Sequence, residues 1–231
     1  MTFPNAILQL LRWFRPEAKG DAMSTAGELA VAEALRLWNL DVYDPPKSDK
    51  SERAVRCRAV IDDILRASGW TWEVPYLGDG QVQWCGLFAA ACWRKAGIDP
   101  SWLSTFWAST LRLDAWARGK SWNGKAAGGP RPFVKLDASS KPEDCLLSDT
   151  SLPKTGDIVI VGDGKPAEGD HIVLCERYDT ATGVFETVGG NGVGFGPTGT
   201  KRQGVVKADF RVGGGGYCVR LVLRPLPGDL L

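Results

Sequence analysis

Residues 81–98 read QVQWCGLFAAACWRKAGI, and this stretch decides the expected fold. A short extended piece runs into a series of small and apolar residues that closes at Gly97, which is typical of a helix ended by glycine. Cys85 falls in the first turn of that helix. Unpaired backbone N–H groups and the helix dipole favour a thiolate at such a position. The stretch therefore predicts a helix with a thiol at its N-terminal end.

Two more helices are expected upstream of this stretch. Apolar residues at three- and four-residue steps over 26–40 predict a helix with one buried face. Its expected face comprises Leu29, Ala32, Leu35 or Arg36, and Leu40. A second helix begins after the capping Ser51 and stops at Gly69. Its expected core residues are Val55, Ile61, Ile64 and Leu65. Residues 1–20 predict a short amphipathic helix rather than a signal peptide or membrane span, although a membrane-surface helix is an alternative.

The chain downstream of Gly156 is typical of strands. The apolar segments are DIVIV (157–161), HIVLCERY (171–178), VFETV (184–188), GVVKADFRV (204–212) and YCVRLVL (217–223), and they are separated by glycine-rich turns. Residues 119–156 are rich in Gly, Pro, Ser and Lys, which indicates long surface loops. Helices first and an antiparallel sheet after predict an α+β fold.

Composition restricts the chemistry. The 231 residues carry 28 Lys and Arg against 27 Asp and Glu, so charge gives no reason to expect nucleic acid as a partner. A single histidine, His171, argues against a hydrolytic zinc site, which usually needs two or three. The six cysteines contain no C-x-x-C pair, and their pairing stays open. We therefore expect neither a metal nor another cofactor.

The position of His171 suggests a partner for the thiol. His171 begins the strand 171–178, and the five residues 179–183 are of the length that closes a hairpin onto 184–188. If Tyr178 pairs with Val184, His171 faces Asn191, and opposed residues share one face of the sheet. Glu186 would then pair with Glu176 and point to the other face. The consecutive glycines 189 and 190 favour a bulge that changes this register.

The order Cys85, His171, Asn191 resembles that of papain-like thiol hydrolases. More closely, the chain resembles the CHAP family, the cysteine, histidine-dependent amidohydrolases/peptidases that cut peptidoglycan peptides. The resemblance rests on WCGLF (84–88), CWRKAGI (92–98), GDIV (156–159), DHIV (170–173) and VGGN (188–191), and it covers about residues 76–223. Asp170 and Gly189 depart from it: many relatives have Gly directly before the histidine and Glu two positions before the Asn.

The resemblance implies a papain-like fold and three catalytic roles. Cys85 would be the nucleophile, His171 the general base and later acid, and Asn191 the orienting residue, with Glu186 as the alternative for that last role. The backbone N–H of Cys85 and the side chain of Gln81 or Gln83 are candidate oxyanion donors. The candidate substrate-binding residues are Trp84, Gly86, Trp122 and Asp170; for Trp84 and for Trp93 an aromatic core is the simpler interpretation. Cys92 and Cys175 are expected to be packed thiols.

The resulting hypothesis is a peptidoglycan hydrolase, either an N-acetylmuramoyl-L-alanine amidase or a peptide endopeptidase. Residues 71–231 would form the catalytic domain, and residues 1–70 a helical extension packed on it. Without a recognisable secretion signal, the enzyme would be made in the cytoplasm and reach the wall by phage lysis or by export as an antibacterial effector with a cognate immunity protein. Alternatives are a papain-like peptidase or deamidase acting on protein, and a non-catalytic wall-binding or virion module.

Overall fold

A computed structural model describes residues 22–69, 83–97, 152–162, 170–211 and 218–223. Its helices are α2 (Ala22–Asn39), α3 (Glu52–Ala67) and α4 (Cys85–Lys95), and its strands are β1 (Ile158–Gly162), β2 (His171–Asp179), β3 (Val184–Phe195), β4 (Lys201–Arg211) and β5 (Cys218–Leu223). The predicted α+β class, with helices before strands, is confirmed. The expected helix within residues 1–20 and most of the loops expected over 119–156 lie outside the described residues.

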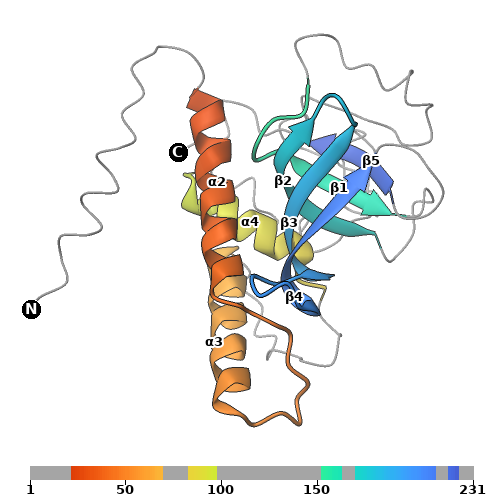
Figure 1. The fold of residues 1–231 in the computed structure, drawn as a ribbon. Helices are drawn as coiled ribbons and strands as arrows, with labels where there is room; N and C mark the ends of the chain where they lie inside the picture. The colour runs from red at the N-terminus through yellow and green to blue at the C-terminus, as the bar shows by residue number, and fades with distance from the viewer. Residues whose placement is uncertain (1–21, 70–82, 98–151, 163–169, 212–217, 224–231) are drawn as a thin grey trace, which may run out of the picture.

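The five strands form one antiparallel sheet in the order β4-β3-β2-β1-β5 (Figure 1). The sheet is curled, and irregular pairing interrupts β2, β3 and β5. β3 and β4 are its longest strands, with 12 and 11 residues. A two-residue break in the β3–β4 pairing falls between Gly189 and Gly192, so Asn191 lies inside it. The glycine pair that favoured a bulge in the sequence does stand at a bulge.

The β2–β3 hairpin differs from the expected register by one residue at its closed end. Tyr178 pairs with Phe185 rather than Val184, and Glu186 pairs with Arg177 rather than Glu176. The carboxylate of Asp179 accepts hydrogen bonds within the turn, from Ala181 N and Thr182 Oγ1, so the turn begins one residue later than expected. Glu186 also forms an ion pair with the opposing Arg177. An irregularity between Cys175 and Arg177 then restores the expected pairing for Leu174 with Val188.

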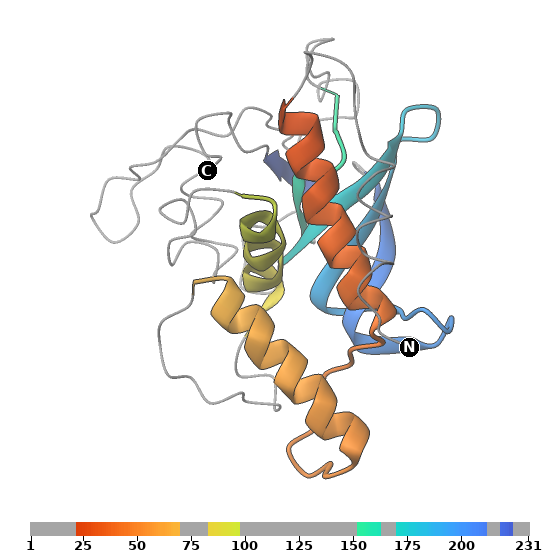
Figure 2. The ribbon, with the colours of Figure 1, turned by 90° about the vertical axis from the view of Figure 1, so that its left-hand side faces the viewer.

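Helix α4 packs against the other two helices and against the sheet, and α2 lies beside it across the same strands (Figures 1 and 2). It contacts α2, α3, β2 and β3. One hydrophobic core joins all three helices to the inner face of the sheet, and the largest fully buried side chains in it include Trp84, Phe88 and Trp93. A second cluster, which includes Val159, Val173 and Phe185, occupies the other face. Residues of α2 and α3 therefore share one core with the sheet.

The buried face of α2 is not the expected one. Leu29 and Leu40 are 53% and 51% exposed, Ala32 and Arg36 are exposed, and Leu35 is half-buried. The buried residues are Ala26, Ala30, Val31, Ala34 and Leu37. Small residues let the helix approach its neighbours closely: a Cβ on Gly27 would lie 2.3 Å from the carbonyl oxygen of Thr155. The alanine face is buried because it allows close packing. Hydrophobic periodicity alone would instead predict that the face with the leucines is buried.

Helix α3 follows the sequence prediction more closely. Ser51 is its N-cap, with Oγ accepting from Ala54 N at 3.2 Å, and Gly69 beyond its C-cap has a φ of +82°. Ile61, Ile64 and Leu65 are buried as expected. Val55 is 55% exposed, so its assignment to the core was wrong. It points away from the face that Ala54 and Cys57 bury.

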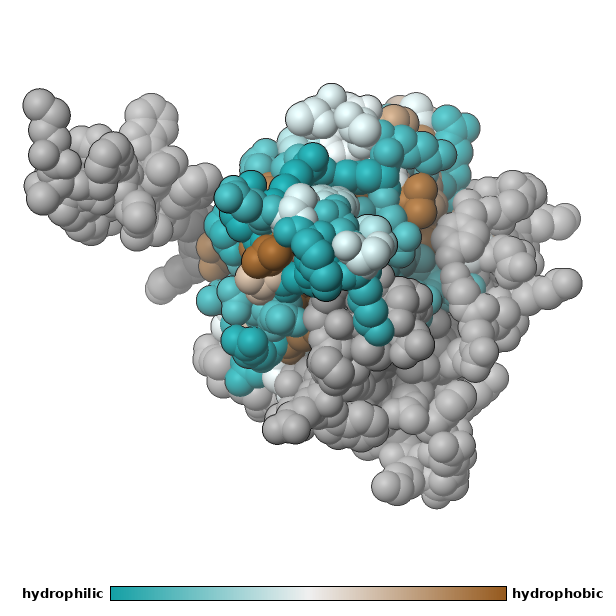
Figure 3. Space-filling view, turned by 90° about the horizontal axis from the view of Figure 1, so that it is seen from below, coloured by the Kyte–Doolittle hydropathy of each residue, from teal (hydrophilic) through white to brown (hydrophobic). Residues whose placement is uncertain are grey.

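Seen from below, the described surface is mainly hydrophilic with scattered apolar residues (Figure 3). Val193 and Phe195 near the end of β3 are the most exposed large hydrophobic residues among those described, at 65% and 56%. Among the described helices, none is both long enough and apolar enough to cross a membrane.

Candidate functional site

Cys85 is the first residue of α4, as predicted. Trp84 precedes it as the N-cap and provides no side-chain cap, so the helix begins with Phe88 N donating to Trp84 O at 2.9 Å. Gly86 and the alanines at 89–91 follow, all buried, which lets α4 lie close to the sheet. The Cys85 side chain is only 3% exposed. The helix therefore holds the thiol at its N-terminal end, beneath the surface.

The surroundings of the Cys85 thiol shift its pKa in opposite directions. Burial raises the pKa of Cys85, because a thiolate loses solvation there. Hydrogen bonds from the backbone N–H groups of Ile172, Gly86 and Cys85 itself lower the pKa and offset part of that rise. At neutral pH the resting group is a thiol. The contact with Ile172 N–H brings the sulfur to the start of β2, one residue from His171.

His171 is the first residue of β2 and pairs with Val161 of β1. Its imidazole lies over the glycines of β3: a Cβ on Gly192 would come within 2.8 Å of Nε2, and one on Gly189 within 3.3 Å. Only glycine leaves this space for the ring. Burial lowers the pKa of His171 from 6.5 to about 4, so the imidazole is neutral at pH 7.

The thiol and the imidazole approach β2 from different sides. A Cβ on Gly189 would meet Val173 and His171, whereas a Cβ on Gly190 would meet Trp84 and Phe88 of the α4 segment. Successive strand residues point to opposite faces, so the ring lies on the Val173 side and α4 on the other. Between the described residues, no hydrogen bond or ion pair joins Cys85 to His171 in this arrangement.

The side chain of Asn191 is hydrogen-bonded to two glutamines rather than to the imidazole. Its φ of +57° belongs to the left-handed region, which asparagine tolerates better than most residues. Its Nδ2 donates to Gln83 Oε1 at 3.2 Å, and its Oδ1 accepts from Gln203 Nε2 at 3.2 Å. Within the described structure it makes no hydrogen bond to His171. The structure thus brings Asn191 to Gln83, two residues before Cys85.

The remaining sequence candidates divide into two groups. Gln81 and Trp122 lie outside the described residues. Asp170, beside His171, is 8% exposed. Gly86 is buried and lies in the first turn of α4. Trp84 is 2% exposed and packs edge-on against Phe88, with ring centroids 6.4 Å apart, as the core interpretation predicts. Its Nε1 is buried without a hydrogen-bond partner among the described atoms.

Sequence reasoning missed Gln203 and the two glycines that accommodate His171. Gln203 is a surface residue on β4 with no surrounding motif, and only the β3–β4 pairing brings it to Asn191. From the sequence, Gly189 indicates only that a carboxylate is absent; in the structure it leaves space for the imidazole. A glycine-rich strand opposite a lone histidine was the available signal.

The other described cysteines offer no second reactive centre. Cys57, Cys92, Cys175 and Cys218 are buried, like Cys85. Burial raises the pKa of Cys92 well above its ordinary value. Cys92 and Cys175 are both fully buried, in agreement with the expectation of packed thiols. Among the described residues, no group of three or more His, Cys, Asp or Glu is arranged to hold a metal ion.

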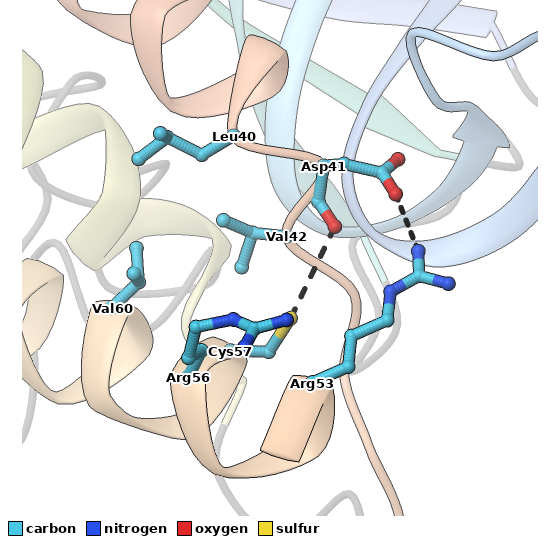
Figure 4. A pocket seen from close by; sticks show the side chains of 7 residues that line it. All are labelled: Leu40, Asp41, Val42, Arg53, Arg56, Cys57 and Val60. Carbon is cyan, nitrogen blue, oxygen red and sulfur yellow. Dashed lines mark hydrogen bonds and ion pairs between the residues drawn. The ribbon is translucent and has the colours of Figure 1, made fainter. Parts of the chain in front are cut away.

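A separate cavity of about 370 Å³ opens between the end of α2 and α3 (Figure 4). Its apolar side chains are Leu40, Val42, Cys57 and Val60. Asp41 is paired with Arg53 at its edge, and Cys57 Sγ lies 4.0 Å from the Asp41 carbonyl oxygen. None of the predicted site residues lines it.

Comparisons with known proteins found no match: no family model, no curated protein and no solved structure is similar to this chain at the threshold applied.

Proposed function

We propose that the protein is a cysteine hydrolase that cuts amide bonds of peptidoglycan and has a papain-like fold. The observation that carries the proposal is the position of Cys85 as the first residue of α4, which packs against β2, the strand that His171 begins. This brings a helix N-terminal thiol to the strand that begins with the chain's single histidine. The family resemblance supplies the substrate class, and the order of Cys85, His171 and Asn191 supplies the type of reaction.

In this proposal the neutral imidazole of His171 accepts the thiol proton while Cys85 Sγ attacks the amide carbonyl carbon. The oxyanion receives hydrogen bonds from the Cys85 backbone N–H and the Gln83 amide. The C–N bond then breaks as the imidazolium gives its proton to the leaving amine, and a thioester remains. Water attacks the thioester, its proton passes to His171, and the released thiolate recovers a proton from the imidazolium.

The resting arrangement requires one movement before this reaction. The imidazole must turn from the Gly189 and Gly192 side towards the sulfur of Cys85. Hydrogen bonds of catalytic groups are often long or absent before substrate binds. A neutral thiol and a neutral imidazole are the correct pair of protonation states for general-base activation.

The direct test is release of soluble fragments from purified peptidoglycan by the wild-type protein, compared with Cys85→Ala and Cys85→Ser. Cys85→Ser keeps nearly the same volume at a buried position, so its loss of activity reports chemistry rather than packing. Cleavage of protein substrates without wall fragments would instead support a papain-like peptidase or deamidase, with the same residues in the same roles.

A non-catalytic wall-binding module is the second candidate, and the separation of the imidazole from the thiol favours it. The two candidates differ in thiol reactivity. A hydrolase requires iodoacetamide to label Cys85 faster than the other buried cysteines, Cys57, Cys92, Cys175 and Cys218. Equal, slow labelling of all five, located by peptide mass spectrometry, would favour the module.

A further inference from the structure

Three carboxamide side chains from distant parts of the chain form one continuous hydrogen-bonded series. Gln203 Nε2 on β4 donates to Asn191 Oδ1 on β3, and Asn191 Nδ2 donates to Gln83 Oε1, both at 3.2 Å. Gln83 is separated from Asn191 by 108 positions and stands two residues before Cys85. The series therefore links the β3–β4 ladder to the segment that leads into α4.

The direction of these bonds has a consequence for Gln83. A carboxamide has one acceptor oxygen and an NH₂ group with two donors. Because the Gln83 oxygen accepts from Asn191, its Nε2 group faces away from Asn191. Nothing among the described residues accepts a hydrogen bond from that group. Within the described part of the chain, both N–H donors of this group are therefore left for a ligand.

The Gln203 end of the series is held by the main chain. Residues 42–44 run along β4, with Asp44 N donating to Gln203 O at 3.1 Å and Val205 N donating to Val42 O at 2.9 Å. The intervening Gly204, at φ +149°, fits against this segment only without a side chain, since a Cβ would lie 2.4 Å from Val42 O. Backbone hydrogen bonds to residues 42–44 thus hold the stretch of β4 that carries the Gln203 donor.

We propose that Gln203 is a positioning residue that acts through Asn191 to present the Gln83 Nε2 group as an oxyanion donor beside Cys85. The proposal rests on the proposed hydrolase function. It adds Gln203, which is not one of the three residues Cys85, His171 and Asn191, to the residues on which that function depends. It also gives Asn191 a different task, which is to orient Gln83 rather than His171.

The test exploits the direction of the bonds. Gln203→Glu keeps the shape of the side chain but replaces the donor by a carboxylate facing Asn191 Oδ1, whereas Gln203→Lys keeps a donor. Gln203→Leu removes the donor without adding charge, in case Gln203→Glu folds poorly. Lys201→Gln is the matched control, because it lies on the same strand, is exposed, and makes the same change of one negative unit.

The readout is the affinity of N-acetylglycinal, whose carbonyl carbon adds to the thiol while the sulfur's proton moves to the former carbonyl oxygen. The aldehyde concentration that protects Cys85 from iodoacetamide gives the Kd of N-acetylglycinal. Alkylation forms no tetrahedral adduct whose oxygen could accept from Gln83, so the alkylation rate in the absence of aldehyde reports the nucleophile alone. We expect about tenfold weaker aldehyde binding in Gln203→Glu and Gln203→Leu, with alkylation rates within twofold of wild type. On wall fragments, kcat falls and KM does not. Gln203→Lys and Lys201→Gln stay near wild type.

Each other outcome is decisive. The role of Gln203 is overturned if Gln203→Glu binds the aldehyde as tightly as wild type does. It is also overturned if wild-type Cys85 is alkylated but binds no aldehyde. In either case, wall hydrolysis by the wild type would show that the proposed function still stands. Wild-type Cys85 that resists alkylation, in a protein that releases no wall fragments, overturns the proposed function and the role of Gln203 together.

Discussion

Gly190 of β3 lies so close to Trp84 that a Cβ on the glycine would be 2.4 Å from the indole Cζ3. The same Cβ would also meet Phe88 at 2.7 Å. Both aromatic residues belong to the α4 segment and are almost fully buried. The absence of a side chain at Gly190 thus sets how closely the helix that carries Cys85 approaches the sheet.

Gly190→Ala is expected to destabilise the protein by about 2–3 kcal/mol, because the added methyl group forces Trp84 or Phe88 out of place. Urea unfolding at pH 7.5 measures the change. Gly199→Asn is the control: a Cβ there meets nothing within 4 Å, and asparagine tolerates its φ of +76°, so a change below about 1 kcal/mol is expected. Equal effects of the two substitutions would contradict the close contact.

Burial of neutral His171 predicts that the free energy of unfolding falls as the pH is lowered. The folded-state pKa of about 4 lies below the ordinary 6.5, so its stabilising contribution is complete above pH 6.5 and is lost as pH falls towards 4. Between pH 7.5 and 4.5 this one group lowers the free energy of unfolding by about 2.5 kcal/mol. Urea unfolding of wild type and His171→Gln at both pH values isolates it. A pH dependence unchanged by the substitution would show that the imidazole is solvated.

The same low pKa determines the acid limb of any hydrolytic activity. For the free enzyme, kcat/KM falls when the base becomes protonated, so activity should persist at pH 5 and decline towards pH 4. The raised pKa of Cys85 places ionisation of the resting thiol above its ordinary range, so activity should not fall with thiol ionisation near neutral pH. A rate profile over pH 3.5–9 gives both limbs. An acid limb near pH 6.5 would contradict a buried base.

Asp41 pairs with Arg53 of α3 and with Arg202 of β4, which is 11% exposed. Asp41→Asn should destabilise the protein by about 1–3 kcal/mol, since Arg202 would remain largely buried without its carboxylate. Asparagine also tolerates the φ of +58° at this position, so backbone strain adds little. The control is Glu52→Gln, whose exposed pair with Arg56 at 3.8 Å should contribute under about 0.5 kcal/mol. Thermal unfolding of both variants at one pH compares them; similar losses would remove Asp41 as a link between α3 and β4.

Much of the fold could be predicted because its signals are local. The Ser51 cap, the glycine ends of α3 and α4, and the apolar runs of β1 to β5 each depend on a few neighbouring residues. The buried face of α2 could not be predicted in this way. Its alanine side is selected by α4 and by Gly156, a contact that only the tertiary fold creates.

The place of Cys85 in the fold was predictable from the sequence, but the contacts of the candidate site residues were not. Cys85 at the helix start follows from local pattern, and the pairing of Leu174 with Val188 follows from the hairpin, despite the one-residue error at its turn. The side that each side chain faces depends on the break around Asn191, where its left-handed backbone redirects the strand. No local signal indicates that this break connects Asn191 to Gln83 and Gln203.

The most direct test of the central claim is mass spectrometry of purified peptidoglycan sacculi after incubation with wild type, Cys85→Ala and His171→Ala. The account predicts soluble fragments from wild type only, with masses that distinguish cleavage of the N-acetylmuramoyl-L-alanine bond from cleavage within the peptide. Fragments released equally by Cys85→Ala, or none released from several wall types by folded wild-type protein, would contradict it.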